Sequence, residues 1–422
     1  MIEKIQRELR QGRSFLGFAA LKACGFGLFF VVPLVLAGIL SPAGFGSYSL
    51  GMMIVYLFAA ILIASSKTPF VVYAREEQQR SDKINKSFSV RFAFVIFAFL
   101  FFTFFSFVLM KPLTTLTLIS ASQFPFLIFA YFGVGLRFFF ENLFLALNKK
   151  IEHAIYELLT GIISIIYLLV LYTFFTITLE GIFVMFFVSS LLAFVLLMHK
   201  INLKEIFPLE FDKKTFWGMF DYTKWSMVGA VSLYFINWGD NIILRLFVSL
   251  EEIGTYNFAY QFFKGILMLT TTISTYYLPF ISQNINNKNK IYDYLFRKRI
   301  KILIASIAAS LLLFYIVPYF IDIFYGTKYE GSILVFRILL LGSVFALYRV
   351  FYSPIFNSLK RYKFTQIAEI GYVTCNLALD YILVPHFGIM GAAIATTFTY
   401  AVMAITSEIY FRKYCRKAIL PS

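Results

Sequence analysis

The stretch NLALDYILVPHFGIMGAAIATTFTY (Asn376–Tyr400) decides the fold, because it is apolar for almost its whole length yet carries one acid and one break. The acid is Asp380, and the break is the Pro-His-Phe-Gly sequence that begins at Pro385. Four residues suffice only for a tight turn, so the stretch predicts a hairpin of two helices. A charge at membrane depth costs roughly 2–3 kcal/mol or more unless it is paired or hydrated, so Asp380 needs an explanation of its own.

Small residues follow this turn at helical spacing, at Gly388, Gly391, Ala395 and Thr399. In lipid, small side chains let helix backbones approach closely and gain van der Waals contact. We therefore interpret this face of the final helix as a packing face and not as a binding face.

The composition of the chain excludes an ordinary soluble protein. Hydrophobic residues make up 60% of it and charged residues only 14%, whereas soluble domains are nearer half apolar and one quarter charged. Apolar spans of about 20 residues, long enough to cross a bilayer, recur from end to end. The sequence predicts an all-α polytopic membrane protein with twelve spans, at 15–40, 46–70, 88–110, 119–141, 152–175, 180–198, 224–248, 254–280, 299–322, 331–356, 363–384 and 388–411.

The net charge of +16 reflects topology and not a nucleic-acid surface. Segments on the expected cytoplasmic side carry 29 Lys and Arg residues, whereas the opposite segments carry only Lys111 and Lys328. The positive-inside rule then places both termini in the cytoplasm. Lys67 and Arg137 are expected near cytoplasmic helix ends, where long basic side chains can reach the interface. The first apolar stretch is too long for a signal peptide, and nucleic acid is excluded as a partner.

Metal and nucleotide chemistry are not expected. The cysteines and histidines are scattered through the chain, at Cys24, Cys375, Cys415, His153, His199 and His386. No HExxH or CxxC spacing occurs, so we predict no metal site and no disulfide framework. No Gly-rich phosphate motif occurs either, so the chain is not expected to hydrolyse ATP. We assign no catalytic residue and no cofactor.

The chain repeats itself at a shift near 210 residues. SPAGFGSYSL (Ser41–Leu50) aligns with SLEEIGTYNF (Ser249–Phe258), so that Gly46 meets Gly254. Two further pairs of segments match in the same register: Ala146–Gly161 with Ser358–Gly371, and Leu179–Phe183 with Pro385–Met390. Three matches in one register predict two six-helix lobes, 1–212 and 213–422, related by an axis along the membrane normal with a central cavity between them.

These residues carry a resemblance to a known family. The Phe-Gly-Ser-Tyr turn after the first helix and the final hairpin, Asn-Leu-x-Leu-Asp followed by Pro-x-Phe-Gly-Ile-x-Gly-Ala-Ala-Ile-Ala-Thr, resemble Wzx-type polysaccharide flippases of the MOP (MATE-like) superfamily. The hairpin, 376–397, is the specific part, and the two-lobe architecture covers the whole chain. Many members have Asn where this chain has Asp380.

The resemblance implies a function. Such flippases move undecaprenyl-diphosphate-linked oligosaccharides, of O-antigen or capsule type, from the cytoplasmic to the periplasmic leaflet of the bacterial inner membrane by alternating access. A polysaccharide polymerase and a chain-length regulator are the implied partners, beside the lipid bilayer. The resemblance therefore implies a transporter and not an enzyme.

Polar residues inside the spans form stripes, which lipid-facing helices would not carry. Glu369, Asn376 and Asp380 return to nearly one azimuth over about 16 Å of helix rise. Together the stripes indicate a hydrated cavity. We predict that the cations and amides bind the anionic substrate, and these are Lys22, Asn257, Gln261, Lys264, Arg337 and Arg349. We predict that the acids, Asp240, Glu369 and Asp380, couple transport to H⁺ or Na⁺. The alternative is that the charges pair with one another, for example Asp240 with Arg245 or Lys264.

Two other functions remain open from the sequence. A multidrug or cation exporter of the same superfamily would favour acidic pockets, whereas the Lys and Arg residues here favour an anionic head. A membrane glycan polymerase would need room for catalysis outside the bilayer, and the loops expected on that side are only a few residues long.

Overall fold

All regular secondary structure is helical in the part of the chain that the computed structural model describes, residues 2–359 and 361–419. The α-helices are α1 (Ile2–Ile39), α2 (Pro42–Leu62), α3 (Lys67–Ser81), α4 (Asn85–Val108), α5 (Met110–Thr117), α6 (Phe126–Ala146), α7 (Lys150–Phe174), α8 (Leu179–Leu197), α9 (Lys213–Phe247), α10 (Leu250–Asn284), α11 (Lys288–Tyr292), α12 (Arg299–Tyr325), α13 (Ser332–Val350), α14 (Ser353–Ser358), α15 (Tyr362–Phe387), α16 (Ile389–Tyr410) and α17 (Arg416–Ile419). Two π-helical segments, Asp293–Lys298 and Phe411–Cys415, flank α12 and α16.

Each predicted span overlaps at least one helix. Eleven helical segments of the described chain are long and apolar enough to cross a membrane. The long helix α10 is not among them, and it carries Glu251, Glu252 and Lys264 within its length. The observed fold is thus the all-α membrane architecture that the composition predicts.

The predicted hairpin at the end of the chain is confirmed. A single residue, Gly388, separates α15 from α16, and its φ of +55° lies in the left-handed region that favours glycine. Helix α15 continues through Pro385 to Phe387, three residues beyond the predicted end of this span at 384. A Cβ added to Gly391 would lie 2.5 Å from the Leu383 carbonyl oxygen, so the absence of a side chain lets the two helices touch.

One span lies further along the chain than the sequence predicts. The predicted span 119–141 is observed as α6, Phe126–Ala146, because Pro125 occupies the position before its first turn. The shift moves Arg137 from an expected helix end to the middle of the helix. The prediction that Arg137 reaches the interface is therefore wrong. The preceding connection is also longer than expected, since it includes the eight-residue helix α5.

Residues near the helix ends explain where two long helices begin. The Ser249 side chain accepts from the Glu252 amide, and Glu252 in turn accepts from the Ser249 backbone, which forms a capping box for α10. Asp212 precedes α9 and accepts hydrogen bonds from the Thr215 amide at 2.8 Å and hydroxyl at 2.6 Å. These hydrogen bonds lower the pKa of the Asp212 carboxyl below its usual range.

The described chain divides into two compact units. Unit 1 comprises 1–39 and 50–234, and unit 2 comprises 40–49 and 235–422. The division falls inside α2 and inside α9, so each of these helices contributes to both units. The lobe boundary predicted at 212/213 coincides with the first residue of α9, and it remains a prediction.

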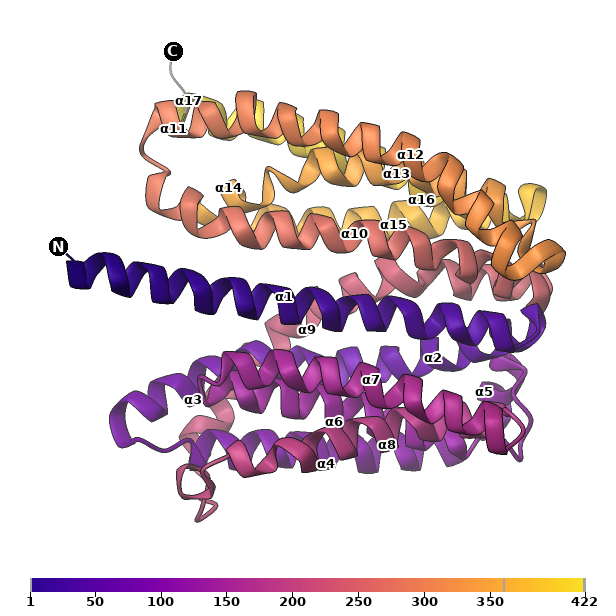
Figure 1. Cartoon of the computed structure of the whole chain (residues 1–422), viewed down its shortest axis with the longest axis horizontal. Helices are drawn as coiled ribbons and strands as arrows, with labels where there is room; N and C mark the ends of the chain where they lie inside the picture. Colours follow the sequence, from indigo (N-terminus) through magenta and orange to yellow (C-terminus); the bar gives the residue numbers. More distant parts are fainter. Residues whose placement is uncertain (1, 360, 420–422) are drawn as a thin grey trace. The chain divides into compact units, whose positions relative to one another are not determined.

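Each unit is a helical bundle with its own pattern of contacts (Figure 1). In unit 1, α6 packs against α8, and α7 packs against both α1 and α8. In unit 2, α13 packs against α16, α10 and α12, and α15 packs against α16. The hairpin that decides the fold therefore lies within the packing of unit 2.

The repeated turns meet each other inside unit 2. A Cβ on Gly46 would lie 2.1 Å from the Leu250 carbonyl oxygen, and a Cβ on Gly254 would lie 1.9 Å from the Pro42 carbonyl oxygen. The first turns of α2 and α10 thus cross backbone to backbone. Only glycine fits at these two positions, which explains why both repeats carry it.

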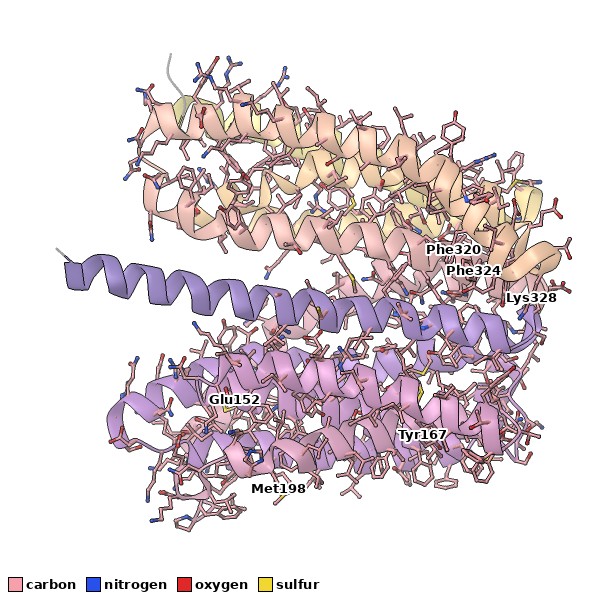
Figure 2. All side chains as sticks on the ribbon, in the orientation of Figure 1. Glu152, Tyr167, Met198, Phe320, Phe324 and Lys328 are labelled. Carbon is pink, nitrogen blue, oxygen red and sulfur yellow. The ribbon has the colours of Figure 1, made fainter. Side chains whose placement is uncertain are left out.

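Large apolar side chains cover the outer surfaces of the helices, as the sticks in Figure 2 show. Phe324 is 67% exposed and Met198 is 53% exposed, and Phe174 at the end of α7 reaches 77%. Water would penalise such surfaces, whereas lipid tails solvate them without cost.

Topology can be tested with reporter fusions. Because basic residues concentrate on one set of helix ends, fusions after Ser41, Thr176, Glu251 and Tyr329 should report the side of the membrane opposite the cytoplasm. Fusions after Gln79, Asn202 and Asn287 should report the cytoplasm. An inverted pattern in either half of the chain would contradict the predicted orientation.

Candidate functional site

Two acids predicted to couple transport lie together in unit 2, in a buried set of polar side chains that we call the acidic cluster. Asn376 donates from its Nδ2 atom to Asp240 Oδ1 and to Asp380 Oδ2, both at 2.7 Å. Thr396 donates to Asp240 Oδ2 at 2.9 Å, and the Tyr256 hydroxyl donates to the same oxygen. Helices α9, α10, α15 and α16 each supply part of the cluster.

The acidic cluster has no counter-charge within ion-pair distance in the described residues. Asp380 is fully buried and Asp240 is 3% exposed. The Asp380 Oδ1 atom is buried with no hydrogen-bond partner. The pairing of Asp240 with Lys264, which the sequence left open, is absent from the ion pairs of the described chain. Two buried carboxylates, a hydroxyl and an orphaned oxygen are suited to a small cation or a shared proton.

Lys264 lies on α10 against aromatic rings. Its Nζ atom is 4.1 Å from the Trp238 ring centroid and 5.0 Å from the Tyr260 ring centroid. Lys264 is only partly buried, and the described residues place no carboxylate within 4 Å of it. A cation held by ring faces keeps its charge available for an anion. Asn257, which follows Tyr256 of the cluster in the chain, donates to Asn241 Oδ1 at 2.5 Å. Gln261, one turn further along α10, is partly buried.

The two arginines of α13 have different surroundings. Arg349 forms an ion pair with Glu369 and lies 5.3 Å from the Tyr372 ring centroid. Glu369 is therefore placed against a cation and not in the acidic cluster. Arg337 lies 4.4 Å from the Phe314 ring centroid, and its buried Nε atom has no hydrogen-bond partner.

Lys22 belongs to a separate network in unit 1. Its ammonium donates to Glu157, which is 2% exposed and also lies 3.8 Å from Arg137 Nη2. Arg137 donates to Glu141 at 2.8 Å and stacks 3.4 Å from the Phe29 ring centroid. The network balances two cations with two anions, so Lys22 must leave Glu157 before it can bind an anion. It also explains why Arg137 stays inside the bundle.

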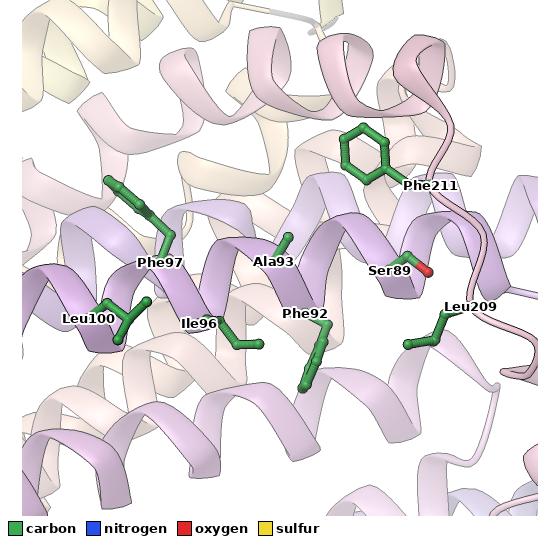
Figure 3. Close-up of a pocket in the computed structure, with 8 residues that line it drawn as sticks. All are labelled: Ser89, Phe92, Ala93, Ile96, Phe97, Leu100, Leu209 and Phe211. Atoms are coloured by element: carbon green, nitrogen blue, oxygen red, sulfur yellow. The ribbon is translucent and has the colours of Figure 1, made fainter.

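An apolar groove lies on the outer face of α4. It has a volume of about 460 Å³, and the segment before α9 covers one end of it with Leu209 and Phe211 (Figure 3). The remaining lining residues come from α4, and they are Ser89, Phe92, Ala93, Ile96, Phe97 and Leu100. Ser89 is the single polar residue of this set, so the groove offers nothing that would bind a sugar or a diphosphate.

The described residues hold no group of three or more His, Cys, Asp or Glu side chains that could bind a metal ion. The cysteines Cys24, Cys375 and Cys415 are all free thiols.

Sequence reasoning missed several partners in unit 2. Tyr256 and Tyr260 precede Lys264 at intervals of four residues, so all three share one face of α10. This spacing could have revealed them, but tyrosine inside an apolar span is usually a packing residue. Trp238 and Thr396 gave no such signal, because their positions depend on how separate helices meet.

Residues 13–285 match the family described as "Polysaccharide biosynthesis protein". Two curated relatives come from Haloferax volcanii. "Probable low-salt glycan biosynthesis flippase Agl15" is 26% identical over 208 residues, which cover 47% of this chain and 42% of that protein. "Probable flippase AglR" is 25% identical over 257 residues, which cover 59% and 52%. The chain thus spans about half the length of the curated relatives it matches.

Two solved structures share the fold. "Lipid II flippase MurJ, inward closed conformation" has a TM-score of 0.78 at 16% identity, covering 95% of this chain and 88% of that one. A multidrug resistance MATE family transporter of the MOP superfamily, in an inward-facing conformation, has a TM-score of 0.77 at 12% identity, covering 93% of both chains. At these identities the likeness establishes the fold alone, and it confirms the predicted two-lobed, MATE-like architecture.

Proposed function

Because the chain belongs to the polysaccharide biosynthesis protein family, we propose that it is a flippase for lipid-linked glycan precursors. Its substrate is an undecaprenyl-diphosphate-linked oligosaccharide of O-antigen or capsule type, which it moves across a bacterial inner membrane by alternating access. The relatives named as flippases and the fold shared with a lipid II flippase support this proposal. A polymerase and a chain-length regulator receive the product and are its partners.

The observation that carries the proposal is Lys264, a cation held by two aromatic rings with no carboxylate within 4 Å in the described chain. A diphosphate is strongly anionic, and a low-dielectric path must offer it cations. Arg349 is the second cation, and it becomes available when the phosphate displaces Glu369. The polyprenyl tail stays in lipid throughout.

The acidic cluster is the coupling site. Asp240 and Asp380 bind one H⁺ or Na⁺ during the cycle, and the unpartnered Asp380 Oδ1 atom supports this role. The sequence predicts that Glu369 binds the coupling ion, but this proposal gives it another role, because its partner is Arg349. It governs the release of that arginine and not the binding of the coupling ion.

A cation exporter is the second candidate. The acidic cluster, for which the described residues offer no counter-charge within ion-pair distance, and the likeness to a multidrug MATE transporter favour it. The two candidates differ in the role of Lys264, which an exporter of cations does not need.

Loss of Lys264 tests the flippase directly. Lys264→Ala should reduce surface glycan export by at least about tenfold, because one charge-assisted contact to phosphate is worth about 1.5–3 kcal/mol. Arg349→Ala and Arg337→Ala should reduce export as well, since each removes a cation of α13. Export is measured as surface glycan per cell at matched membrane levels of the protein.

Lys264→Arg is the conservative control, and it should retain part of the export because the charge is kept while its geometry changes. Full export by Lys264→Ala, together with loss of resistance to a cationic drug in the Asp240→Asn variant, would support the exporter and contradict the flippase.

A further inference from the structure

A continuous set of side chains joins the acidic cluster to Lys264. The Tyr256 hydroxyl donates to Asp240, and the Tyr256 ring stacks on the Tyr260 ring with 5.7 Å between centroids and 26° between planes. The Tyr260 ring in turn lies 5.0 Å from Lys264 Nζ. All three α10 residues belong to unit 2, as does Asp240.

We propose that cation binding at the acidic cluster and anionic headgroup binding at Lys264 are positively coupled, so that each ligand raises the affinity for the other. The proposal rests on the proposed function, since it takes the headgroup to be a diphosphate. It adds that the ion and the glycan lipid are bound together and not in exchange for each other. The coupling residues are Tyr256 and Tyr260, which hold the space between the two sites.

The sign of the coupling follows from the charges. With the acidic cluster empty, its carboxylates oppose the approach of a diphosphate to Lys264. One bound cation removes a negative charge from this region, so the diphosphate is attracted more strongly. By thermodynamic linkage the bound diphosphate strengthens cation binding by the same factor.

The size of the coupling follows from helix geometry. Tyr256 and Lys264 are eight residues apart on α10, which is about 12 Å of helix rise. Taking this rise as the separation of the two charges, one unit charge changes the binding constant of another by about tenfold at an effective dielectric constant near 20, and by about twofold in water.

The tyrosines keep the coupling near tenfold, and not near the twofold value for water, because they exclude water. Tyr256 is 1% exposed and Tyr260 is 2% exposed, so the stacked rings fill the space along α10 between the sites. Replacing one ring by a small polar side chain would admit water and screen the charge. Tyr260 is therefore a positioning residue: it touches neither the bound cation nor the diphosphate, and it acts by keeping water out of the space between them.

The test measures binding of geranylgeranyl diphosphate, a short polyprenyl diphosphate, to the purified full-length protein. The chain has three tryptophans, and Trp238 lies against Lys264. A Trp217→Phe/Trp225→Phe background therefore leaves one fluorescent reporter at the site. The dissociation constant is determined in NaCl and in choline chloride at equal ionic strength, each over a series of pH values.

The expected result is a dissociation constant about tenfold lower when Na⁺ or H⁺ occupies the acidic cluster. Asp380→Asn should abolish this dependence while the probe still binds. Tyr260→Ser should reduce the ratio to about twofold, whereas Tyr276→Ser, at a 64% exposed tyrosine of the same helix, should leave the ratio unchanged.

The experiment distinguishes failure of the coupling from failure of the proposed flippase function. Binding that is independent of both Na⁺ and pH would overturn the coupling and leave the flippase standing. Binding weakened by the cation would also overturn it, in favour of exchange. Absence of probe binding under every condition would overturn the proposed function and the coupling with it.

Discussion

Replacing Gly254 by alanine should strongly destabilise the protein. The new Cβ would lie 1.9 Å from the Pro42 carbonyl oxygen and 2.8 Å from the Pro42 carbonyl carbon. Backbone atoms cannot rotate away as a flexible side chain can, so the two helices must separate. Overpacking of this kind costs about 1–3 kcal/mol, and sometimes more. The measurement is the thermal midpoint of the purified protein, together with glycan export in cells.

Gly229→Ala and Gly371→Ala are matched controls. A Cβ at either position meets nothing within 4 Å, and both glycines are in long helices. Alanine should be neutral there or slightly stabilising, because glycine in a helix costs roughly 0.5–1 kcal/mol relative to alanine. Equal midpoints for Gly254→Ala and its controls would show that the α2–α10 crossing is not as close as described.

The second large effect is expected at Asp380. Asp380→Asn removes the charge whose Oδ1 atom has no partner, while it keeps an oxygen toward Asn376. The affinity for the coupling ion should fall by about 10- to 100-fold, because contacts to a charged group contribute about 1.5–3 kcal/mol. Asp240→Asn should lower the affinity for the coupling ion by a similar factor. The measurement is glycan-lipid transport in proteoliposomes under an imposed Na⁺ or pH gradient.

Asp322→Asn is the control for this experiment, since it removes an exposed acid of α12. Glu369→Gln should change transport without changing its ion dependence, because Glu369 lies against Arg349. Unaltered ion dependence in both Asp240→Asn and Asp380→Asn would remove the acidic cluster from the coupling mechanism.

The sequence predicts the fold well because lipid imposes strong local rules. Every span needs about 20 apolar residues, and the hairpin at Gly388 follows from one turn between two such runs. The sequence predicts the start of α6 too early in the chain, because the apolar residues before Pro125 resemble the span itself. Helix boundaries next to proline therefore shift the expected depth of charges such as Arg137.

The site was predicted only in part. Asp240, Asn376 and Asp380 stand out in the sequence because polar residues are costly at membrane depth. Which of them meet depends on the rotation and register of α9, α15 and α16, and these are set by packing. The sequence could not show that Glu369 pairs with Arg349, or that Lys22 is held by Glu157.

The glycine crossing also bears on the origin of the chain. Gly46 meets Leu250 and Gly254 meets Pro42, and each residue of the first turn has its counterpart 208 positions later. Such reciprocity, in which i contacts j and j contacts i, defines the isologous interface of a twofold homodimer. Gene duplication and fusion preserve such an interface inside a single polypeptide. The contact between the two turns therefore has the geometry that fusion of a twofold dimer through this glycine would leave.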